Sequence, residues 1–273
     1  MSRKENSGIY IFQGNTLIVQ EDTPDSLIQE EVSKETAALF FNESIDRFVI
    51  PSLDGQTDIE AITLGEGELP SGWKAIPLRQ ALSIITGETI AEGSGFLGRI
   101  MRSHHISLWR LDSRFCGSCG GLNKDADSGE LARQCPDCGR LEFPRIAPAV
   151  TIIVTNDKDE ALLAHNSKFA TKVYSLIAGF NEPGECLENT VVREVKEEVN
   201  LDVRDIRYIR SQPWPFPCSL MLGFTARYCG GELKPDGIEI ADAQWFSREA
   251  LPNLPGSASL SRHLIDLWLA KKL

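Results

Sequence analysis

The sequence predicts a mixed α/β (α+β) fold whose C-terminal part is a sandwich of helices around a sheet. The run AVTIIVT at 149–155 is rich in β-branched residues, which suit a buried strand. Strands and helices then alternate along the chain, and this order is typical of a sheet covered by helices. The remaining segments are strands at 161–166, 205–212 and 219–228, a helix over 187–199 and an amphipathic helix within 257–273.

The N-terminal part has a different pattern and carries no catalytic motif. It predicts short strands at 8–12, 16–20, 47–51 and 59–64, followed by helices near 78–86 and 94–106. We therefore expect a mixed α+β domain over 1–107, a small cysteine-containing domain over 108–143 and the sandwich over 144–273.

Composition and charge exclude some classes of function for this chain. The chain has 273 residues, of which 42% are hydrophobic and 25% are charged, as in an ordinary globular protein. No apolar run reaches the roughly 18 residues of a membrane span, and no signal-peptide pattern is seen. We therefore expect a cytoplasmic protein without a membrane partner. The formal net charge of −11 argues against an extended nucleic-acid-binding face, which would favour basic residues.

Four of the seven cysteines occur in two pairs, CGSC and CPDC. Two such pairs supply the four thiolates that zinc prefers in tetrahedral sites. With four protein ligands no coordination position stays open, so the spacing predicts one structural zinc ion per chain. The predicted ligands are Cys116, Cys119, Cys135 and Cys138.

The stretch REVKEEVN at 193–200 places three carboxylates on one face of the predicted helix. Glu194, Glu197 and Glu198 are spaced i, i+3 and i+4, so their like charges repel. One interpretation is an ordinary solvated face. The other is a site for Mg²⁺ or Mn²⁺, whose charge would remove the repulsion and hold a pyrophosphate. The glycine-containing loop before the helix favours the second interpretation.

The wider stretch at 178–201 resembles the Nudix box, G-x5-E-x7-R-E-U-x-E-E-x-G-U, where U is aliphatic. The matching positions are Gly179, Glu185, Arg193, Glu194, Val195, Glu197, Glu198 and Leu201. The chain departs once, because Asn200 stands where the family has glycine. Asn is the next best residue for the left-handed conformation common at helix C-termini, so we expect little loss from this change.

A second stretch, SQPWPFPCS at 211–219, resembles the signature that follows the Nudix box in NADH pyrophosphatases. Those enzymes also carry a four-cysteine zinc ribbon before the Nudix domain. From the residues themselves, three prolines should hold this segment extended, and Trp214 and Phe216 offer flat faces for a ring of the substrate. The alternative is a purely structural loop.

The resemblance implies roles for individual residues. It implies a catalytic cluster made of Glu194, Glu197, Glu198, Arg193 and Glu185. It implies Mg²⁺ or Mn²⁺ ligands on the Ala178 carbonyl, Glu194, Glu198 and Glu239. It implies substrate contacts at Gln212, Pro213, Trp214, Pro215, Phe216, Pro217, Cys218 and Ser219, with Glu130, Phe143, Phe180 and Ser261 as further candidates.

The resemblance also implies an activity: metal-dependent hydrolysis of the pyrophosphate of NADH or NAD⁺ to nicotinamide mononucleotide and AMP. Removal of NAD caps from RNA is a close variant, and family members form homodimers. Two alternatives stay open, namely a Nudix hydrolase acting on ADP-ribose or another nucleoside diphosphate, and a non-catalytic zinc-ribbon binding module.

The other candidate residues receive ordinary interpretations. His104 and His105 are adjacent, so they face apart on a helix, and we expect both to be surface or boundary residues. Cys186, Cys218 and Cys229 have no histidine nearby in sequence, which favours packing over nucleophilic roles.

Overall fold

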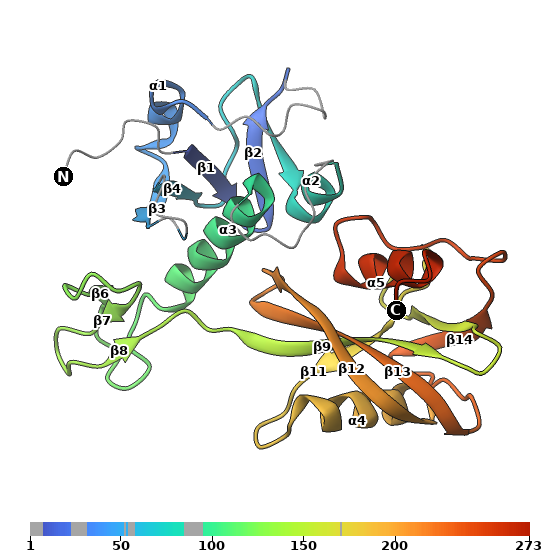
Figure 1. Ribbon diagram of the computed structural model, residues 1–273. Helices are drawn as coiled ribbons and strands as arrows, with labels where there is room; N and C mark the ends of the chain where they lie inside the picture. Colours follow the sequence, from blue (N-terminus) through green and yellow to red (C-terminus); the bar gives the residue numbers. More distant parts are fainter. Residues whose placement is uncertain (1–7, 23–31, 52, 54–57, 85–94, 170) are drawn as a thin grey trace. The chain divides into compact units, whose positions relative to one another are not determined.

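The computed structural model describes the chain except for residues 1–7, 23–31, 52, 54–57, 85–94 and 170 (Figure 1). It divides into two compact units. The first comprises 1–146 and 215–218, and the second comprises 147–214 and 219–273. Within the described residues, no helix combines the length and the apolar character needed to cross a membrane.

The first unit is built on a five-stranded sheet with the order β3-β4-β1-β2-β5. Its strands are β1 (Gly8–Gln13), β2 (Thr16–Gln20), β3 (Ser44–Ile50), β4 (Ile59–Leu64) and β5 (Trp73–Pro77). Strands β1 and β4 run parallel, while the other pairs are antiparallel. The four strands predicted here are confirmed, and β5 is an addition.

Short helices and one long helix complete this unit. They are α1 (Lys34–Ala37), the 3-10 turn η2 (Ala38–Phe40), α2 (Leu78–Ile84) and α3 (Phe96–Asp112). The predicted helices near 78–86 and 94–106 correspond to α2 and α3, although positions 85, 86 and 94 lie outside the described residues. Because α3 continues to Asp112, the predicted domain boundary at 107 falls inside a helix.

The prediction for His104 was wrong. Its side chain is fully buried on α3, with its ring 5.3 Å from that of Phe12 and Nε2 3.2 Å from the Gly14 carbonyl oxygen. Burial lowers the pKa of His104 to about 4, so the ring is neutral at physiological pH. His105 is half-buried, as expected of a boundary residue.

Three two-residue strands, β6 (Lys124–Asp125), β7 (Arg133–Gln134) and β8 (Leu141–Glu142), form a small antiparallel sheet near the cysteine pairs. A segment with so little strand structure has a small core of its own, and therefore depends on other restraints for stability.

The second unit contains the predicted sandwich. Its sheet has the order β12-β13-β9-β10-β14, with β11 also paired to β9. The strands are β9 (Ala147–Thr155), β10 (Ala161–Asn166), β11 (Ile177–Phe180), β12 (Leu201–Trp214), β13 (Ser219–Gly231) and β14 (Ile240–Phe246). The helices α4 (Leu187–Val199) and α5 (Leu260–Leu269) cover opposite faces of this sheet (Figure 1).

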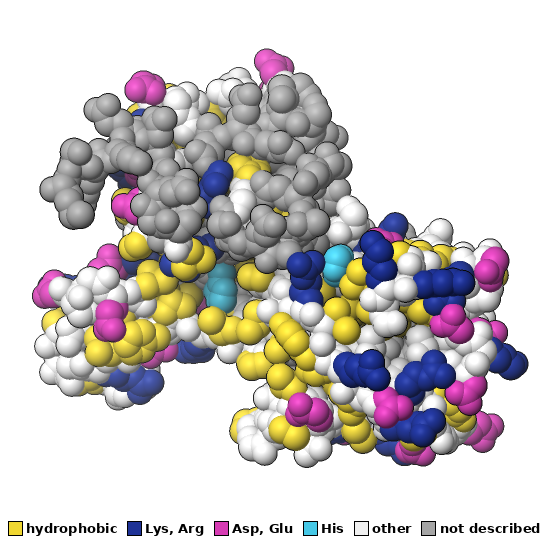
Figure 2. Space-filling view, viewed as in Figure 1, with side chains coloured by type: hydrophobic (Ala, Val, Ile, Leu, Met, Phe, Trp, Pro, Cys, Tyr) yellow, Lys and Arg dark blue, Asp and Glu magenta, His cyan; other side chains and the backbone are white. Residues whose placement is uncertain are grey.

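The alternation of side chains along β9 explains the two layers. Val150, Ile152 and Val154 pack with the α4 side, whereas Ile153 packs with the α5 side. On α4, Val191 and Val195 are four residues apart, so they form one stripe of the helix, and both are fully buried. On the face of this unit seen in Figure 2, lysine and arginine side chains are interspersed with acidic ones.

Candidate active site and metal centre

Gly179 on β11 makes room for the carboxylate of Glu194 on α4. A Cβ atom at position 179 would lie 2.0 Å from Cδ of Glu194 and 2.1 Å from its Oε1. Real contacts of this kind do not occur, so the carboxylate occupies the space that any other side chain would take. Glu194 is consequently only 8% exposed. The glycine that opens the motif is therefore required by a close approach of helix and strand.

Arg193 uses all five of its N–H donors, four of them on the acidic side chains of this region and one on a backbone carbonyl. Its guanidinium binds both oxygens of Glu185, with Nε–Oε1 at 3.0 Å and Nη2–Oε2 at 2.9 Å. Nη1 donates to Oε1 of Glu194 at 2.7 Å and to Oε2 of Glu197 at 3.1 Å. The remaining bond, 2.8 Å long, goes from Nη2 to the carbonyl oxygen of Phe180 on β11. One side chain thus fixes the helix carboxylates relative to the strand.

Glu185 is itself held in place, which makes it a support for Arg193. It accepts a hydrogen bond of 2.9 Å from the Thr190 hydroxyl and one of 3.2 Å from the Glu182 N–H. The Arg193 guanidinium lowers the pKa of Glu185 to about 2, so this carboxyl stays ionised. Thr190 also accepts a bond of 2.8 Å from Asn181, and sequence reasoning missed both of these supporting residues.

Glu198, one turn after Glu194, is 5% exposed, and its Oε2 is buried without a hydrogen-bond partner. Burial raises the pKa of Glu198 to about 8, and the charges of Glu194, Glu239 and Asp236 act in the same direction. Leaving a buried carboxylate oxygen unpaired costs free energy, and neighbouring negative charges increase this cost. Such a site favours a positive charge in its centre.

Glu197 differs from its two neighbours because its side chain is 61% exposed. The three carboxylates therefore differ in environment, because the 100° turn per residue places Glu194 and Glu198 toward β11 and leaves Glu197 toward solvent. The solvated-face interpretation describes Glu197 alone.

The loop before β14 brings further acidic groups to this region. Asp236 accepts hydrogen bonds from the N–H groups of Ile238, Glu239 and Ile240, at 3.1, 3.2 and 2.8 Å. Its own N–H donates to the Glu198 carbonyl oxygen at 3.0 Å, which attaches the loop to the end of α4. Glu239 is exposed and pairs with Lys168 at 3.0 Å. Asp236 was missed by sequence reasoning; the Asp-Gly pair at 236–237 predicts the turn but not its position near Glu198.

The residues present fit a divalent cation of the Mg²⁺ or Mn²⁺ type. Carboxylate oxygens are hard ligands, and Glu198 has a buried oxygen without a partner. Ala178, whose carbonyl was predicted as a further ligand, lies on β11 and gives a backbone hydrogen bond that lowers the pKa of Glu198. Among the described residues, the four cysteines are the group whose possible ligand atoms all lie close together. The carboxylate oxygens of the helix do not approach one another as closely.

Asn200 ends the helix in the manner expected from its position. It adopts the left-handed conformation, with φ 58° and ψ 27°, and its N–H donates to the Lys196 carbonyl oxygen. Its side-chain amide donates to the Glu232 carbonyl oxygen at 3.0 Å, which compensates for the conformational cost of a residue other than glycine.

The segment 212–219 is a β-hairpin, not a continuous extended stretch as predicted. Trp214 at the end of β12 pairs with Ser219 at the start of β13, and Pro215–Cys218 forms the turn between them. Pro213 lies within β12, opposite Leu220. The β12–β13 pairing overrides the local preference of the prolines, which are tolerated because they lie on an edge strand and in a turn.

Gln212 is fully buried, and its amide donates to the Ala258 carbonyl oxygen at 2.9 Å. It is placed to hold the segment that precedes α5 and has no exposed surface for a ligand. Trp214, Phe216 and Cys218 are half-buried, and Pro213 and Pro217 are exposed. Pro215 and Ser219 are buried.

The four further substrate candidates lie in both units. Glu130 and Phe143 belong to the first unit, and Phe180 and Ser261 to the second. Glu130, Phe143 and Phe180 are exposed, as residues that contact a ligand must be. Ser261 is half-buried near the start of α5, and its hydroxyl lies 2.9 Å from that of Thr151 on β9.

The four paired cysteines meet at one point of the first unit. All their sulfur atoms lie within 4.8 Å of one another, and Cys116–Cys138, Cys119–Cys135 and Cys119–Cys138 are 3.6, 3.4 and 3.5 Å apart. A tetrahedron with metal–sulfur bonds of about 2.3 Å has sulfur–sulfur edges of about 3.8 Å. The cluster therefore has the dimensions of a tetrahedral zinc site.

The two cysteine turns have the same backbone geometry. In each, a glycine with φ 76° follows the second cysteine, and its N–H donates to the carbonyl oxygen of the first. These glycines are Gly120 and Gly139. Backbone N–H groups, that of Ser118 first, lower the pKa of Cys116 to about 6. The pKa values of Cys119 and Cys138 are raised, although the N–H groups of Gly121 and Arg140 act in the opposite direction, because these thiols are hydrogen-bonded to neighbouring sulfur atoms. The remaining cysteines, Cys186, Cys218 and Cys229, are free thiols.

The chain is similar in sequence to proteins of known family. A family model described as the NUDIX domain matches residues 145–267. A protein named NAD-capped RNA hydrolase NudC from Pseudomonas fluorescens is 43% identical over 225 residues, covering 82% of this chain and 78% of that protein. A protein of the same name from Stutzerimonas stutzeri is 41% identical over 252 residues, covering 90% and 88%. The crystal structure of a Nudix hydrolase from Nitrosomonas europaea is 26% identical, covers 51% of this chain and 80% of its own, and has a TM-score of 0.45.

Proposed function

Because the chain belongs to the NADH pyrophosphatase family of Nudix hydrolases, we propose that it hydrolyses the pyrophosphate bond of NADH and NAD⁺ and removes NAD caps from RNA. The observation that best supports this proposal is the Glu194–Glu198 pair, two buried carboxylates one helical turn apart against the strand that carries Gly179. The cost of burying two like charges is offset when a cation and its phosphate ligand bind there.

In the proposed reaction, the oxygen of a water molecule forms a bond to one phosphorus while the bond from that phosphorus to the bridging oxygen breaks. NADH gives reduced nicotinamide mononucleotide and AMP, and the water's second proton passes to a base. Glu194, Glu198, Glu239 and the Ala178 carbonyl would hold Mg²⁺ or Mn²⁺. A cation bound there neutralises the pyrophosphate oxygens and lowers the pKa of the attacking water.

The chain's own residues have separate tasks in this proposal. Arg193 orients the carboxylates of Glu194 and Glu197 through the bonds described above. We propose that Glu197, whose side chain is the most exposed of the three glutamates, accepts the proton of water or adds a metal ligand. Phe180, exposed beside the cluster, offers a face on which a base of the substrate stacks.

The cysteine cluster would hold one zinc ion per chain, which stabilises the fold and takes no part in the chemistry because its four positions are filled. We further propose a three-domain division and a homodimer, as the family resemblance implies, with the second boundary at 143 and the first moved from 107 to the end of α3 at Asp112. Sedimentation of the purified protein measures the oligomeric state.

Product analysis tests the proposed function. The protein is incubated with NADH, NAD⁺, ADP-ribose and NAD-capped RNA in the presence of Mg²⁺ or Mn²⁺, and the products are identified by chromatography. We expect a mononucleotide of nicotinamide from NADH, NAD⁺ and the capped RNA, with 5′-phosphorylated RNA as the second product of the last. Exclusive cleavage of ADP-ribose would favour a different Nudix activity, and no cleavage of any compound would favour a binding module.

A further inference from the structure

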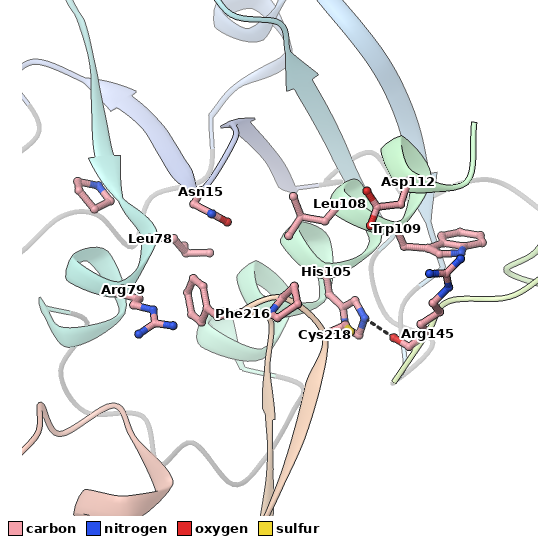
Figure 3. Close-up of a pocket in the computed structure, with 12 residues that line it drawn as sticks. Asn15, Leu78, Arg79, His105, Leu108, Trp109, Asp112, Arg145, Phe216 and Cys218 are labelled. Atoms are coloured by element: carbon pink, nitrogen blue, oxygen red, sulfur yellow. Dashed lines mark hydrogen bonds between the residues drawn. The ribbon is translucent and has the colours of Figure 1, made fainter. Parts of the chain in front are cut away.

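The first unit contains a pocket of about 710 Å³, but several of the groups that line it are engaged within the protein (Figure 3). The Arg79 guanidinium lies 4.6 Å from the centroid of the Phe216 ring, and the His105 ring lies 2.7 Å from the Arg145 carbonyl oxygen. Trp109 is only 4% exposed. The pocket therefore does not identify a ligand, whereas an exposed cation of the second unit lies beside the acidic site.

Lys168 is this cation, and it is bound to one of the proposed metal ligands. Its Nζ donates a hydrogen bond of 3.0 Å to Oε1 of Glu239. Asp236 connects Glu239 to the end of α4, because it accepts a bond of 3.2 Å from the Glu239 N–H and donates its own N–H to the Glu198 carbonyl oxygen at 3.0 Å. The ammonium of Lys168 thus occupies a carboxylate that belongs to the proposed metal site.

The backbone around Lys168 is held beside Glu239 by hydrogen bonds of the turn that follows β10. The N–H of Lys168 donates to Oδ1 of Asn166 at 2.9 Å. The N–H of Ser167 donates to the Glu239 carbonyl oxygen at 2.8 Å, and its hydroxyl donates to the Ile238 carbonyl oxygen at 2.8 Å. If the ammonium leaves Glu239, it therefore stays within the length of one lysine side chain from the site.

Lys168 also has hydrogen-bonding capacity that Arg193 lacks. An ammonium group has three N–H donors, and among the described residues its one hydrogen bond goes to Glu239. Arg193, in contrast, already uses all five of its donors within the protein. The Lys168 side chain is 72% exposed, so its remaining donors are accessible to a phosphate oxygen.

We propose that Lys168 is the counter-ion of Glu239 in the metal-free protein, that a divalent cation displaces it, and that the released ammonium binds a pyrophosphate oxygen of the substrate. This inference rests on the proposed function and deepens it, because it adds a substrate-binding residue outside α4. An ion pair between exposed side chains is weak, so a metal ion breaks it at little cost. A lysine ammonium is a compact charge that is suited to phosphate.

Binding of Mn²⁺ tests the displacement without turnover. Free Mn²⁺ is measured by electron paramagnetic resonance in the zinc-loaded protein without substrate. We expect Lys168→Gln to bind Mn²⁺ about two- to fivefold more tightly than wild type, the range that corresponds to one exposed ion pair. Lys172→Gln is the matched control and should leave the affinity unchanged, because Lys172 is an exposed lysine of the same loop whose ammonium lies over the Tyr174 ring, 5.8 Å from its centroid.

A double variant shows whether Lys168 acts through Glu239. Glu239→Gln alone should weaken Mn²⁺ binding, because it removes a proposed ligand. In that background Lys168→Gln should no longer tighten binding, since no carboxylate remains for the ammonium to occupy. The same gain in both backgrounds would show that Lys168 acts only as a nearby charge, which would overturn the displacement.

Steady-state kinetics test the phosphate contact, with Mn²⁺ saturating for each variant. We expect Lys168→Gln to raise KM for NADH and for NAD⁺ by the same factor, at least about threefold, because the pyrophosphate is common to both. We expect kcat to stay within about twofold of wild type, as for a contact that is equal in the ground and transition states. Lys172→Gln should change neither constant.

Two further results would overturn the inference. The first is a Mn²⁺ affinity of Lys168→Gln that equals that of wild type or of Lys172→Gln. The second is an unchanged KM for both dinucleotides in Lys168→Gln. If wild type hydrolyses neither NADH nor NAD⁺, the proposed function fails, whereas the Mn²⁺ measurements still decide whether a cation displaces Lys168 from Glu239.

Discussion

Gly179 and Glu194 share one volume: the carboxylate of Glu194 lies where a side chain at position 179 would begin, with only 2.0 Å from Cδ to an added Cβ. Strand β11 has no side chain at this point, and the space is filled by a carboxylate of helix α4. This relationship, and the others described for the second unit, lead to direct tests.

Replacing Gly179 with alanine should move the Glu194 carboxylate and break its 2.7 Å bond with Arg193. We expect kcat/KM for NADH to fall by about a hundredfold, the scale of losing one positioned charge in an active site. Because the displaced atoms are at the end of a flexible side chain, the melting temperature should change by only a few degrees. Gly67→Ala, at a glycine with open space around it, is the control and should leave both quantities unchanged.

Replacing Arg193 with lysine keeps the positive charge but loses the fork that binds Glu185 through two bonds. Several of the five hydrogen bonds are lost, so we expect at least a tenfold fall in kcat and a lower melting temperature. The control is Arg262→Lys, because Arg262 also pairs with a carboxylate four residues on, Asp266, but lies on α5. Equal activity of Arg193→Lys and wild type would show that Arg193 does not orient the cluster.

Glu198→Gln should separate activity from stability. The folded protein holds the Glu198 proton up to a pKa of about 8, whereas an unfolded chain loses it near the ordinary glutamate value of about 4.3. Between these values the folded state binds more protons, so this group's contribution to stability falls as pH rises. Glutamine removes that dependence.

We therefore expect the metal-free Glu198→Gln protein to melt at least about 2–4 °C above wild type at pH 8, a shift that corresponds to about 1 kcal/mol in a protein of this size. The difference should vanish near pH 4. Turnover should fall by at least about a hundredfold. Thermal scans from pH 4 to pH 8 measure the stability difference, and turnover is measured at saturating Mn²⁺. An unchanged turnover would show that Glu198 has only a structural role.

Cys135→Ser should lower the zinc content below about one ion per chain and destabilise the first unit, because metal binding contributes to folding there. Cys229→Ser, at an exposed free thiol outside the cluster, is the control and should retain the zinc. Metal content is measured by atomic emission together with a thermal scan. Full zinc content in Cys135→Ser would contradict the assignment of this ligand.

Trp214→Ala tests whether the hairpin recognises the nicotinamide nucleotide of the substrate. Trp214 is half-buried at the end of β12, where it pairs with Ser219. Loss of one aromatic stacking face costs roughly 1–3 kcal/mol, or about five- to over a hundredfold in binding. We expect a raised KM for NADH and a smaller effect on ADP-ribose. The same factor for both substrates would make the hairpin a scaffold.

Local features of the sequence determined the helix α4, its end and the cysteine cluster. The buried stripe of Val191 and Val195, the left-handed Asn200 and the C-x2-C pairs each depend on near neighbours in the chain, so their patterns predict the structure directly. The strands predicted in both units are present for the same reason, because alternation and β-branching act within a few residues.

The tertiary structure alone decided which of these residues are buried, and burial sets their chemistry. His104 is buried because β1 and the loop at Gly14 cover its face of α3. The separation of Glu198 from Glu197 arises where α4 packs on β11, since packing removes water from one carboxylate and leaves it on the other. The turn at Pro215–Cys218 forms because β12 and β13 pair along their whole lengths, from Trp214–Ser219 to Leu201–Gly231, and this pairing outweighs the extended preference of the single prolines.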